Sequence, residues 1–186
     1  MKQQILFIQG GGEGAYEEDG NLVASLRSTL GDVYELHYPQ MPNESDPDYE
    51  PWKVQIKQEL TGLEGEVILI GHSLGSSFLL KYLAEAKIEK PVAGIFLMAT
   101  PYWGGDGWRY EGYETIALPA DFASKLPSGV PIFLYHSRDD EIVPFAHLAL
   151  YAEKLPRAII RKLDRRGHQF NNDLSEVVED IESLSG

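Results

Sequence analysis

The sequence contains no cysteine. This absence excludes disulfide bonds, zinc sites with cysteine ligands and a thiol nucleophile. Long hydrophobic runs are missing too, since no apolar stretch approaches the roughly 20 residues that a membrane-spanning helix needs. The apolar run at 5–8 is too short for a signal-peptide core, and no small-residue cleavage site follows it. We therefore expect a cytoplasmic protein without a membrane partner.

Positive charge is scarce as well. The chain has 16 Lys and Arg against 29 Asp and Glu, which gives a net charge of −13. Nucleic-acid binding needs a clustered positive face, whereas the only basic run here is the short one at 161–166, so no nucleic-acid partner is expected. The 186 residues, of which 43% are hydrophobic, fit one globular domain over 1–186.

Short apolar runs alternate with amphipathic helical patterns along the chain. Strands are expected at 5–8, 33–38, 67–70, 92–99, 132–136 and 159–163, and helices at 22–30 (capped by Asn21), 52–60, 74–86, 145–155 and 174–184. Strands that are apolar on both faces and alternate with helices predict a parallel α/β sheet covered by helices on both sides. Functional residues in such folds gather at the carboxyl ends of the strands.

A glycine-flanked serine follows the third expected strand. The sequence GHSLG at 71–75 matches the pattern G-x-S-x-G, and it stands between a strand and a helix, as in a nucleophile elbow. Glycines are needed there because side chains would clash across so sharp a turn. Ser73 is therefore the candidate nucleophile. The alternative is a glycine-rich turn in which Ser73 only caps the helix.

A serine nucleophile needs a histidine base. His168 is our candidate among five histidines, because it follows the sixth strand and a loop there can reach back over the elbow. His37 belongs to the second strand and His147 to a helix, and the side chain of His72 should point away from the serine. His136 ends the fifth strand and could line the site. A surface loop position is the alternative for His168.

An acid that orients the histidine should follow another strand end. Asp139, Asp140 and Glu141 follow the fifth strand, and each of them could also be a solvated loop charge. Any one of them would give the order Ser, Asp or Glu, His that is expected of an elbow-type hydrolase.

An oxyanion hole requires two backbone donors. Leu74, the residue after the nucleophile, supplies one, and the glycine loop at 10–12 is the natural source of the other. That loop lacks the Lys and Ser/Thr of a phosphate-binding P-loop. A dinucleotide fingerprint remains open only in the form that accepts Ala15 at its last position.

The segment 101–119 is rich in aromatic residues and long for a plain connection. Tyr102, Trp103 and Trp108 are candidates for the wall of a substrate pocket. An exposed surface for a protein partner and a small aromatic cluster beneath a loop are the alternatives.

These motifs together resemble small α/β-hydrolases without a lid, above all the serine hydrolases of the retinoblastoma-binding protein 9 type. The resemblance rests on GHSLG at 71–75, on MPN at 41–43 with Trp52 downstream, on RDDEIVPF at 138–145 and on GHQF at 167–170. It implies a minimal six-stranded α/β-hydrolase fold without a large cap domain.

The resemblance also implies roles for single residues. Asp140 takes the place of the acid, His168 that of the base and Gly11 that of the second oxyanion donor. Two positions depart from the family pattern. Gln9 stands where the glycine loop often begins with His, which would alter how the loop is anchored. Arg166 stands where many relatives have Gly, and it would either favour an acidic substrate or face solvent.

We therefore expect a carboxylesterase-like serine hydrolase that cleaves an ester, thioester or amide bond of a small acyl substrate. Ser73, His168 and Asp140 would carry the reaction, with no metal and no organic cofactor. The alternative is a non-catalytic protein-interaction module on the same fold. The identity of the substrate and the oligomeric state are left open.

Overall fold

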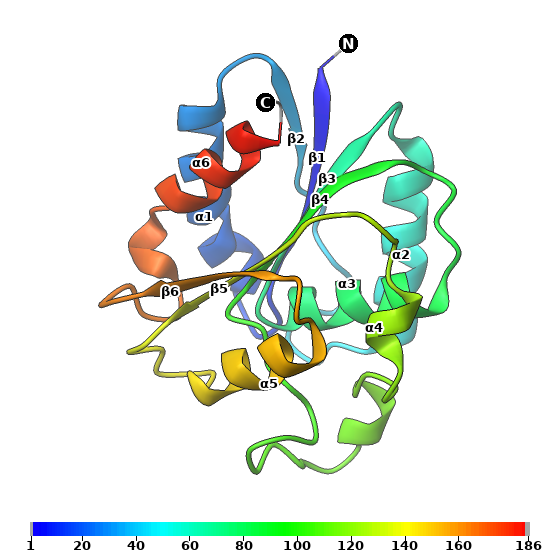
Figure 1. Cartoon of the computed structure of the whole chain (residues 1–186), viewed down its shortest axis with the longest axis vertical. Coiled ribbons are helices and arrows are strands. Elements are labelled where there is room, and N and C mark those ends of the chain that lie inside the picture. The colour runs from blue at the N-terminus through cyan, green and yellow to red at the C-terminus, as the bar shows by residue number, and fades with distance from the viewer. Residues whose placement is uncertain (1, 185–186) are drawn as a thin grey trace.

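Six strands form one sheet in the computed structural model, which describes residues 2–184 (Figure 1). The strands pair in parallel in the order β2-β1-β3-β4-β5-β6. Their bounds are β1 Gln3–Ile8, β2 Tyr34–His37, β3 Val67–His72, β4 Val92–Met98, β5 Ile132–Ser137 and β6 Ile159–Leu163. All six lie where the apolar runs predicted them, within a few residues at each end.

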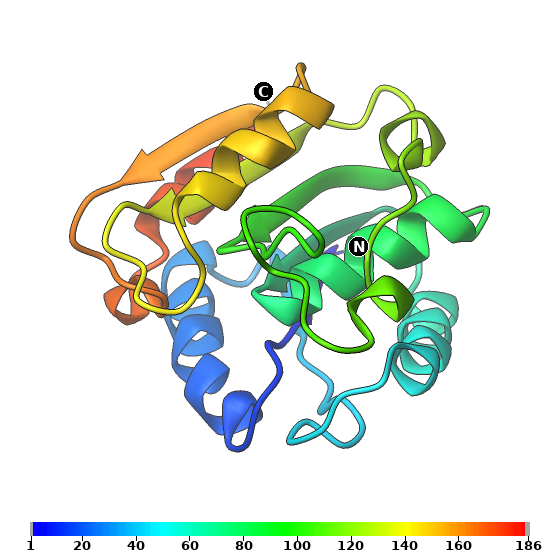
Figure 2. The same ribbon diagram turned by 90° about the horizontal axis from the view of Figure 1, so that it is seen from below.

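Helices cover both faces of the sheet. The helices are α1 Ala15–Leu30, α2 Tyr49–Gly62, α3 Leu74–Glu85, α4 Phe122–Lys125, α5 Ala146–Lys154 and α6 Ser175–Ser183. One face packs on α1 and α6, and the other packs on α2, α3, α4 and α5 (Figures 1 and 2). Among the described residues, no helix has the length and apolar character needed to cross a bilayer.

Two buried cores explain why the strands read as apolar on both faces. Alternate residues of β1 point to opposite sides, so that Leu6 packs against α2 and α3 whereas Phe7 packs against α1 and α6. The same alternation holds in β3 for Leu69 and Ile70. A strand enclosed on both sides needs apolar residues at every position.

The start of helix α1 was predicted wrongly. The helix begins at Ala15, six residues before the expected cap Asn21, which lies inside it. Gly14, in the left-handed conformation, precedes the first turn. The carboxylate of Glu44 accepts hydrogen bonds from the N–H groups of Gly14 and Tyr16 at 3.1 and 2.8 Å. The cap of this helix therefore comes from a loop 30 positions away, which no local pattern reveals.

Two further differences are small. Helix α2 begins at Tyr49 rather than at Trp52, after Asp48, whose side chain accepts a hydrogen bond from the Glu50 N–H. The short helix α4, which buries Phe122, was not predicted at all. Between β4 and α4 the chain forms a long loop with one turn of 3₁₀-helix, η1 Tyr113–Thr115.

The order of the strands places two loops side by side at one edge. Strand β1 lies between β2 and β3, so the chain winds outward from β1 in one direction and then from β3 in the other. Ligands of open α/β sheets bind where the winding reverses, outside the carboxyl ends of the strands. Here those ends carry the glycine loop at 10–12 and Ser73.

Candidate active site

The turn at Ser73 joins β3 to α3 in a strained conformation. Ser73 has φ 52° and ψ −124°, a left-handed region that a residue with a Cβ rarely adopts. The flanking glycines are required by the space available. A Cβ on Gly71 would lie 2.6 Å from the Ser76 Cα, and one on Gly75 would lie 2.1 Å from the Gln9 carbonyl oxygen. The geometry is that of a nucleophile elbow.

The predicted base meets this serine. His168 lies after β6, and its Nε2 is 3.1 Å from the Ser73 Oγ. On the far side of the ring, Nδ1 is 3.0 and 2.9 Å from the two carboxylate oxygens of Asp140, which follows β5. Three side chains from three separate strand ends therefore form one continuous chain of hydrogen bonds.

Asp140 is fully buried and ionised. Burial alone would raise the pKa of its carboxyl group, but hydrogen bonds from His136 and His168 outweigh burial and hold the pKa well below its usual range. The backbone N–H groups of Ile142 and Val143 also donate to this carboxylate at 2.9 and 2.8 Å. His136 was expected to line the site; its Nε2 lies 3.2 Å from the Asp140 Oδ2.

The two acids beside Asp140 hold the same histidine loop by its backbone. Asp139 accepts a hydrogen bond from the Gly167 N–H at 3.0 Å, and Glu141 accepts one from the His168 N–H at 3.1 Å. Only Asp140 contacts the imidazole ring. The geometry thus distinguishes three acids that reasoning from the residues alone had left equivalent.

The two residues predicted to supply the oxyanion donors pack against each other. A Cβ added to Gly11 would be 2.5 Å from the Leu74 Cδ2, so the glycine loop packs directly on the start of α3. Neither the Gly11 N–H nor the Leu74 N–H has a hydrogen-bond acceptor within residues 2–184. Two free donors at a helix N-terminus suit an anionic oxygen.

Gln9 anchors the glycine loop in a way that the sequence did not specify. Its side chain is fully buried. The amide oxygen accepts a hydrogen bond from the Met41 N–H at 2.8 Å, and the amide nitrogen donates to Glu44 at 2.8 Å. The loop after β1 is therefore fixed to the loop after β2.

His72 points away from Ser73, as predicted, and toward a residue that the sequence analysis missed. Its Nδ1 lies 3.0 and 2.9 Å from the two carboxylate oxygens of Asp19, which is buried on α1. A signal for Asp19 existed in the sequence. It stands three, four and seven positions before the apolar residues of the helix, Leu22, Val23 and Leu26, and so shares their buried face.

The aromatic residues of the segment 101–119 pack mainly on one another. Trp103 donates from its indole N–H to the Ser77 hydroxyl, one turn into α3, at 3.2 Å. Its ring lies 5.0 Å from that of Trp108, which meets His147 edge-on, also at 5.0 Å. Tyr102 packs instead on Tyr151 of α5. All three predicted pocket residues are half-buried.

Arg166 neither faces solvent freely nor points a free charge at Ser73. Its guanidinium contacts the carboxylates of Asp173 and Glu176, and only 19% of its side chain is exposed. The positive charge at this position is therefore neutralised by Asp173, just before α6, and by Glu176 in its first turn.

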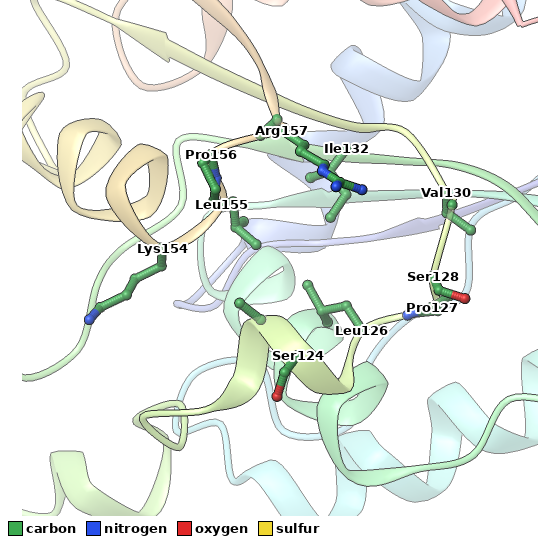
Figure 3. Close-up of a pocket in the computed structure, with 13 residues that line it drawn as sticks. Ser124, Leu126, Pro127, Ser128, Val130, Ile132, Lys154, Leu155, Pro156 and Arg157 are labelled. Atoms are coloured by element: carbon green, nitrogen blue, oxygen red, sulfur yellow. The ribbon is translucent and has the colours of Figure 1, made fainter.

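A cleft away from Ser73 has a volume of about 290 Å³ (Figure 3). It opens between the segments 123–132 and 154–158, where the apolar side chains of Leu126, Ile132 and Leu155 lie beside Arg157. These segments precede β5 and β6, so the cleft lies at the amino ends of the strands. Ser73 lies at the carboxyl ends, and the cleft is not part of the site.

No group of three or more His, Asp or Glu side chains in the described part of the chain is arranged to hold a metal ion. The polar groups around Ser73 are instead engaged with one another. Such an arrangement suits proton transfer at the Ser73 hydroxyl, and the free N–H groups of Gly11 and Leu74 suit a negative oxygen.

Comparison with known proteins identifies the family of the chain. A family model described as "Serine hydrolase" matches residues 26–175. YdeN of Bacillus subtilis is 23% identical over 151 residues, which cover 77% of this chain and 75% of YdeN. The crystal structure of the B. subtilis ydeN gene product superposes with a TM-score of 0.76 at 20% identity, covering 100% of this chain and 99% of that one.

Other solved structures share the fold at similarly low identity. SOBER1 from Arabidopsis thaliana has a TM-score of 0.68 at 17% identity, with 100% of both chains covered. The meta-cleavage product hydrolase CumD from Pseudomonas fluorescens IP01 has a TM-score of 0.67 at 15% identity, with 98% of this chain and 89% of CumD covered. The six-stranded sheet is therefore an α/β-hydrolase fold without a large cap domain, as predicted.

Proposed function

The chain belongs to the serine hydrolase family, and on that premise we propose that it cleaves an ester, thioester or amide bond of a small acyl substrate through an acyl-enzyme on Ser73. One observation carries the proposal. The Ser73 Oγ lies 3.1 Å from Nε2 of His168, and the other ring nitrogen of His168 meets the buried Asp140 carboxylate at 2.9 Å.

The protonation states follow from the partners. Asp140 is ionised and can only accept, so the proton on His168 resides on Nδ1 and leaves Nε2 free to accept from the Ser73 hydroxyl. As the Ser73 Oγ attacks the acyl carbon, its proton passes to His168 Nε2. The imidazolium then gives that proton to the leaving alcohol, thiol or amine when the acyl bond breaks.

Hydrolysis of the acyl-enzyme repeats the same steps with water. His168 takes a proton from the water, the hydroxide adds to the acyl carbon, and the proton returns to the Ser73 Oγ as the acid product leaves. In both halves the negative oxygen would accept hydrogen bonds from the Gly11 and Leu74 N–H groups. Losing one such donor reduces kcat by about 10²- to 10³-fold in a comparable enzyme.

The substrate class is a finer proposal. We propose that the protein is a serine hydrolase of the retinoblastoma-binding protein 9 type, with a carboxylesterase-like preference for small acyl groups. The indole of Trp103, bonded to Ser77 one turn after the nucleophile, would border the bound acyl or alcohol group together with Trp108 and Tyr102. Without a large cap domain, the substrate would reach Ser73 directly.

The direct test is labelling with a fluorescent fluorophosphonate. We expect the wild-type protein to be labelled and Ser73→Ala to be unlabelled. Ser28→Ala is the matched control, because Ser28 is an exposed serine on α1 and its loss should leave labelling unchanged. If the wild type is not labelled, or if labelling survives in Ser73→Ala, the proposal fails and the non-catalytic interaction module becomes the better reading.

A panel of p-nitrophenyl esters of increasing acyl length addresses the substrate. Ser73→Ala should lower kcat by about 10⁶-fold, as removal of a serine nucleophile does elsewhere. Trp103→Ala should raise KM most for the longer acyl chains, because the wall that contacts them is lost. Unchanged kinetics in this variant across the whole panel would discard the pocket.

A further inference from the structure

A second Asp–His pair lies beneath the candidate site. His72 and Asp19 are 1% and 2% exposed. The His72 Nδ1 meets the Asp19 carboxylate at 2.9 Å, and Nε2 lies 2.9 Å from the backbone carbonyl oxygen of His168. The rings of His72 and His168 are 4.9 Å apart between centroids. None of these contacts is used by the proton transfers proposed above.

Both nitrogens of His72 face oxygen acceptors. A carbonyl oxygen and an ionised carboxylate can both only accept hydrogen bonds. Two hydrogen bonds from His72 therefore require a proton on each of its ring nitrogens. Burial alone would lower the pKa of His72, but the Asp19 carboxylate more than offsets burial, and the pKa is raised. Burial would likewise raise the pKa of Asp19, yet the histidine lowers it. The two groups form a buried ion pair.

The pair joins three segments that the sequence separates widely. Asp19 also accepts a hydrogen bond from the Gly10 N–H at 2.7 Å and one from the Gln169 side chain at 2.9 Å. The Asp19 carboxylate thus holds Gly10, His72 and Gln169 together. Each of its contacts is one position away from a residue of the proposed machinery.

We propose that His72 and Asp19 are positioning residues for the reaction: His72 fixes the main chain of His168, and Asp19 fixes the glycine loop relative to it. This inference rests on the proposed function. Asp140 orients the His168 ring about its side-chain bonds. The hydrogen bond from His72 to the His168 carbonyl oxygen fixes the position of the His168 backbone relative to Ser73. A displacement of 1 Å at a reacting group can reduce the rate by about 10²-fold.

Two amide substitutions separate the links of His72. In His72→Asn the short amide can donate to Asp19, where Nδ1 did, but it does not reach the His168 carbonyl. In His72→Gln the longer amide can donate to that carbonyl, where Nε2 did. We expect kcat for p-nitrophenyl acetate to fall about 10²-fold in His72→Asn and to recover to within about tenfold of wild type in His72→Gln, with KM unchanged in both.

The control variant is His37→Asn, since His37 ends β2 and bonds to Gln4 rather than to any residue of the site. It should keep wild-type kinetics. Equal losses of kcat in the two His72 variants, or no loss in either, would overturn the inference. If the pair only stabilised the fold, kcat would not depend on whether the amide reaches the His168 carbonyl.

Asp19 gives a second test that leaves the elbow sequence intact. In Asp19→Asn the amide can donate to Nδ1 of a neutral His72 and still accept from the Gly10 N–H, so kcat should stay within about tenfold of wild type. Asp19→Ala removes the bonds to Gly10, His72 and Gln169 and should lower kcat about 10²-fold. Wild-type kcat in Asp19→Ala would overturn the inference. The fluorophosphonate assay separates the two failures: an unlabelled wild type refutes the hydrolase itself, whereas a labelled wild type with unaffected variants refutes only the positioning role.

Discussion

Replacing Gly75 by alanine should damage both stability and activity, although alanine is the better helix former. Gly75 lies in the first turn of α3, where the end of β1 crosses the helix. A Cβ at this position would lie 2.1 Å from the Gln9 carbonyl oxygen and 2.5 Å from that of Ile8. Both atoms belong to backbone within a buried strand end, so neither can rotate away.

The magnitude follows from two opposing effects. Ordinary contact begins at 3.4 Å, so the strand end and the helix must separate by more than 1 Å. Overpacking of this kind destabilises by about 3 kcal/mol at the upper end of the usual range. The gain in helix propensity is at most about 1 kcal/mol. We expect a net loss of about 2 kcal/mol, which lowers the Tm by about 4–8 °C in a chain of this length.

Activity should fall further than stability. Gln9 directly precedes the loop that carries Gly11, so a shift of 1 Å moves the proposed oxyanion donor away from Leu74. The expected loss in kcat is about 10²-fold. Thermal unfolding followed by circular dichroism and hydrolysis of p-nitrophenyl acetate measure the two effects on the same samples.

Gly20→Ala is the matched control, because Gly20 lies inside α1 and a Cβ there meets no atom within 4 Å. This substitution should raise the Tm by about 2–4 °C and leave kcat unchanged. The steric reasoning is refuted if Gly75→Ala unfolds at or above the wild-type temperature while Gly20→Ala behaves as expected.

Three further predictions concern the charges around the site. Asp140→Asn should lower kcat for p-nitrophenyl acetate by about 10⁴-fold, as loss of the orienting carboxylate does in serine proteases; a loss below tenfold would contradict its role. The pKa of Asp140 is lower in the folded protein than in the unfolded chain, where it is about 3.9, so its ionised carboxylate stabilises the fold above that pH. This contribution is lost as the pH falls below that value. The free energy of unfolding, measured with urea, should therefore depend less on pH between about 5 and 2 in Asp140→Asn than in the wild type. Arg166→Gln should leave the ratio of rates on acidic and neutral esters unchanged, because Asp173 and Glu176 already pair with the guanidinium; a shift toward neutral esters would show that its charge reaches the substrate.

The sequence predicted the sheet because its four central strands, β1, β3, β4 and β5, are buried on both faces and read as apolar runs. The edge strands β2 and β6 are exposed or half-buried, and they too lie where the sequence predicted them. The meeting of Ser73 with His168 was predictable for a related reason. In a parallel sheet the carboxyl ends of the strands share one edge, so a loop after β6 can bring His168 to Ser73 although the two are 95 positions apart in the chain.

What the sequence could not reveal depends on contacts between distant loops. The cap of α1 is Glu44, which leaves no local trace at residue 14, and the helix start was therefore misplaced. Reasoning from the residues alone could not choose among Asp139, Asp140 and Glu141, because one position along a turn changes the direction of a side chain; only the family resemblance pointed to Asp140. Helical periodicity could have predicted that Asp19 is buried. It could not have predicted that its partner is His72, because that contact depends on how α1 packs against the turn at Ser73.

Carboxylates from one turn hold the histidine loop in place, with no covering domain involved. Three consecutive acids bind the histidine loop. Asp139 accepts from the Gly167 N–H, Asp140 from the His168 imidazole and Glu141 from the His168 N–H. Asp139 and Glu141 are exposed, whereas the side chain of Asp140 is buried. A buried polar group is destabilising unless it finds a partner, and the Asp140 carboxylate accepts from His168 and from two backbone N–H groups. The buried Asp19 carboxylate likewise accepts hydrogen bonds from Gly10, His72 and Gln169. Because each acid accepts from a different group, no single substitution should release the whole loop, and a six-stranded sheet can hold the serine, base and acid together without a cap.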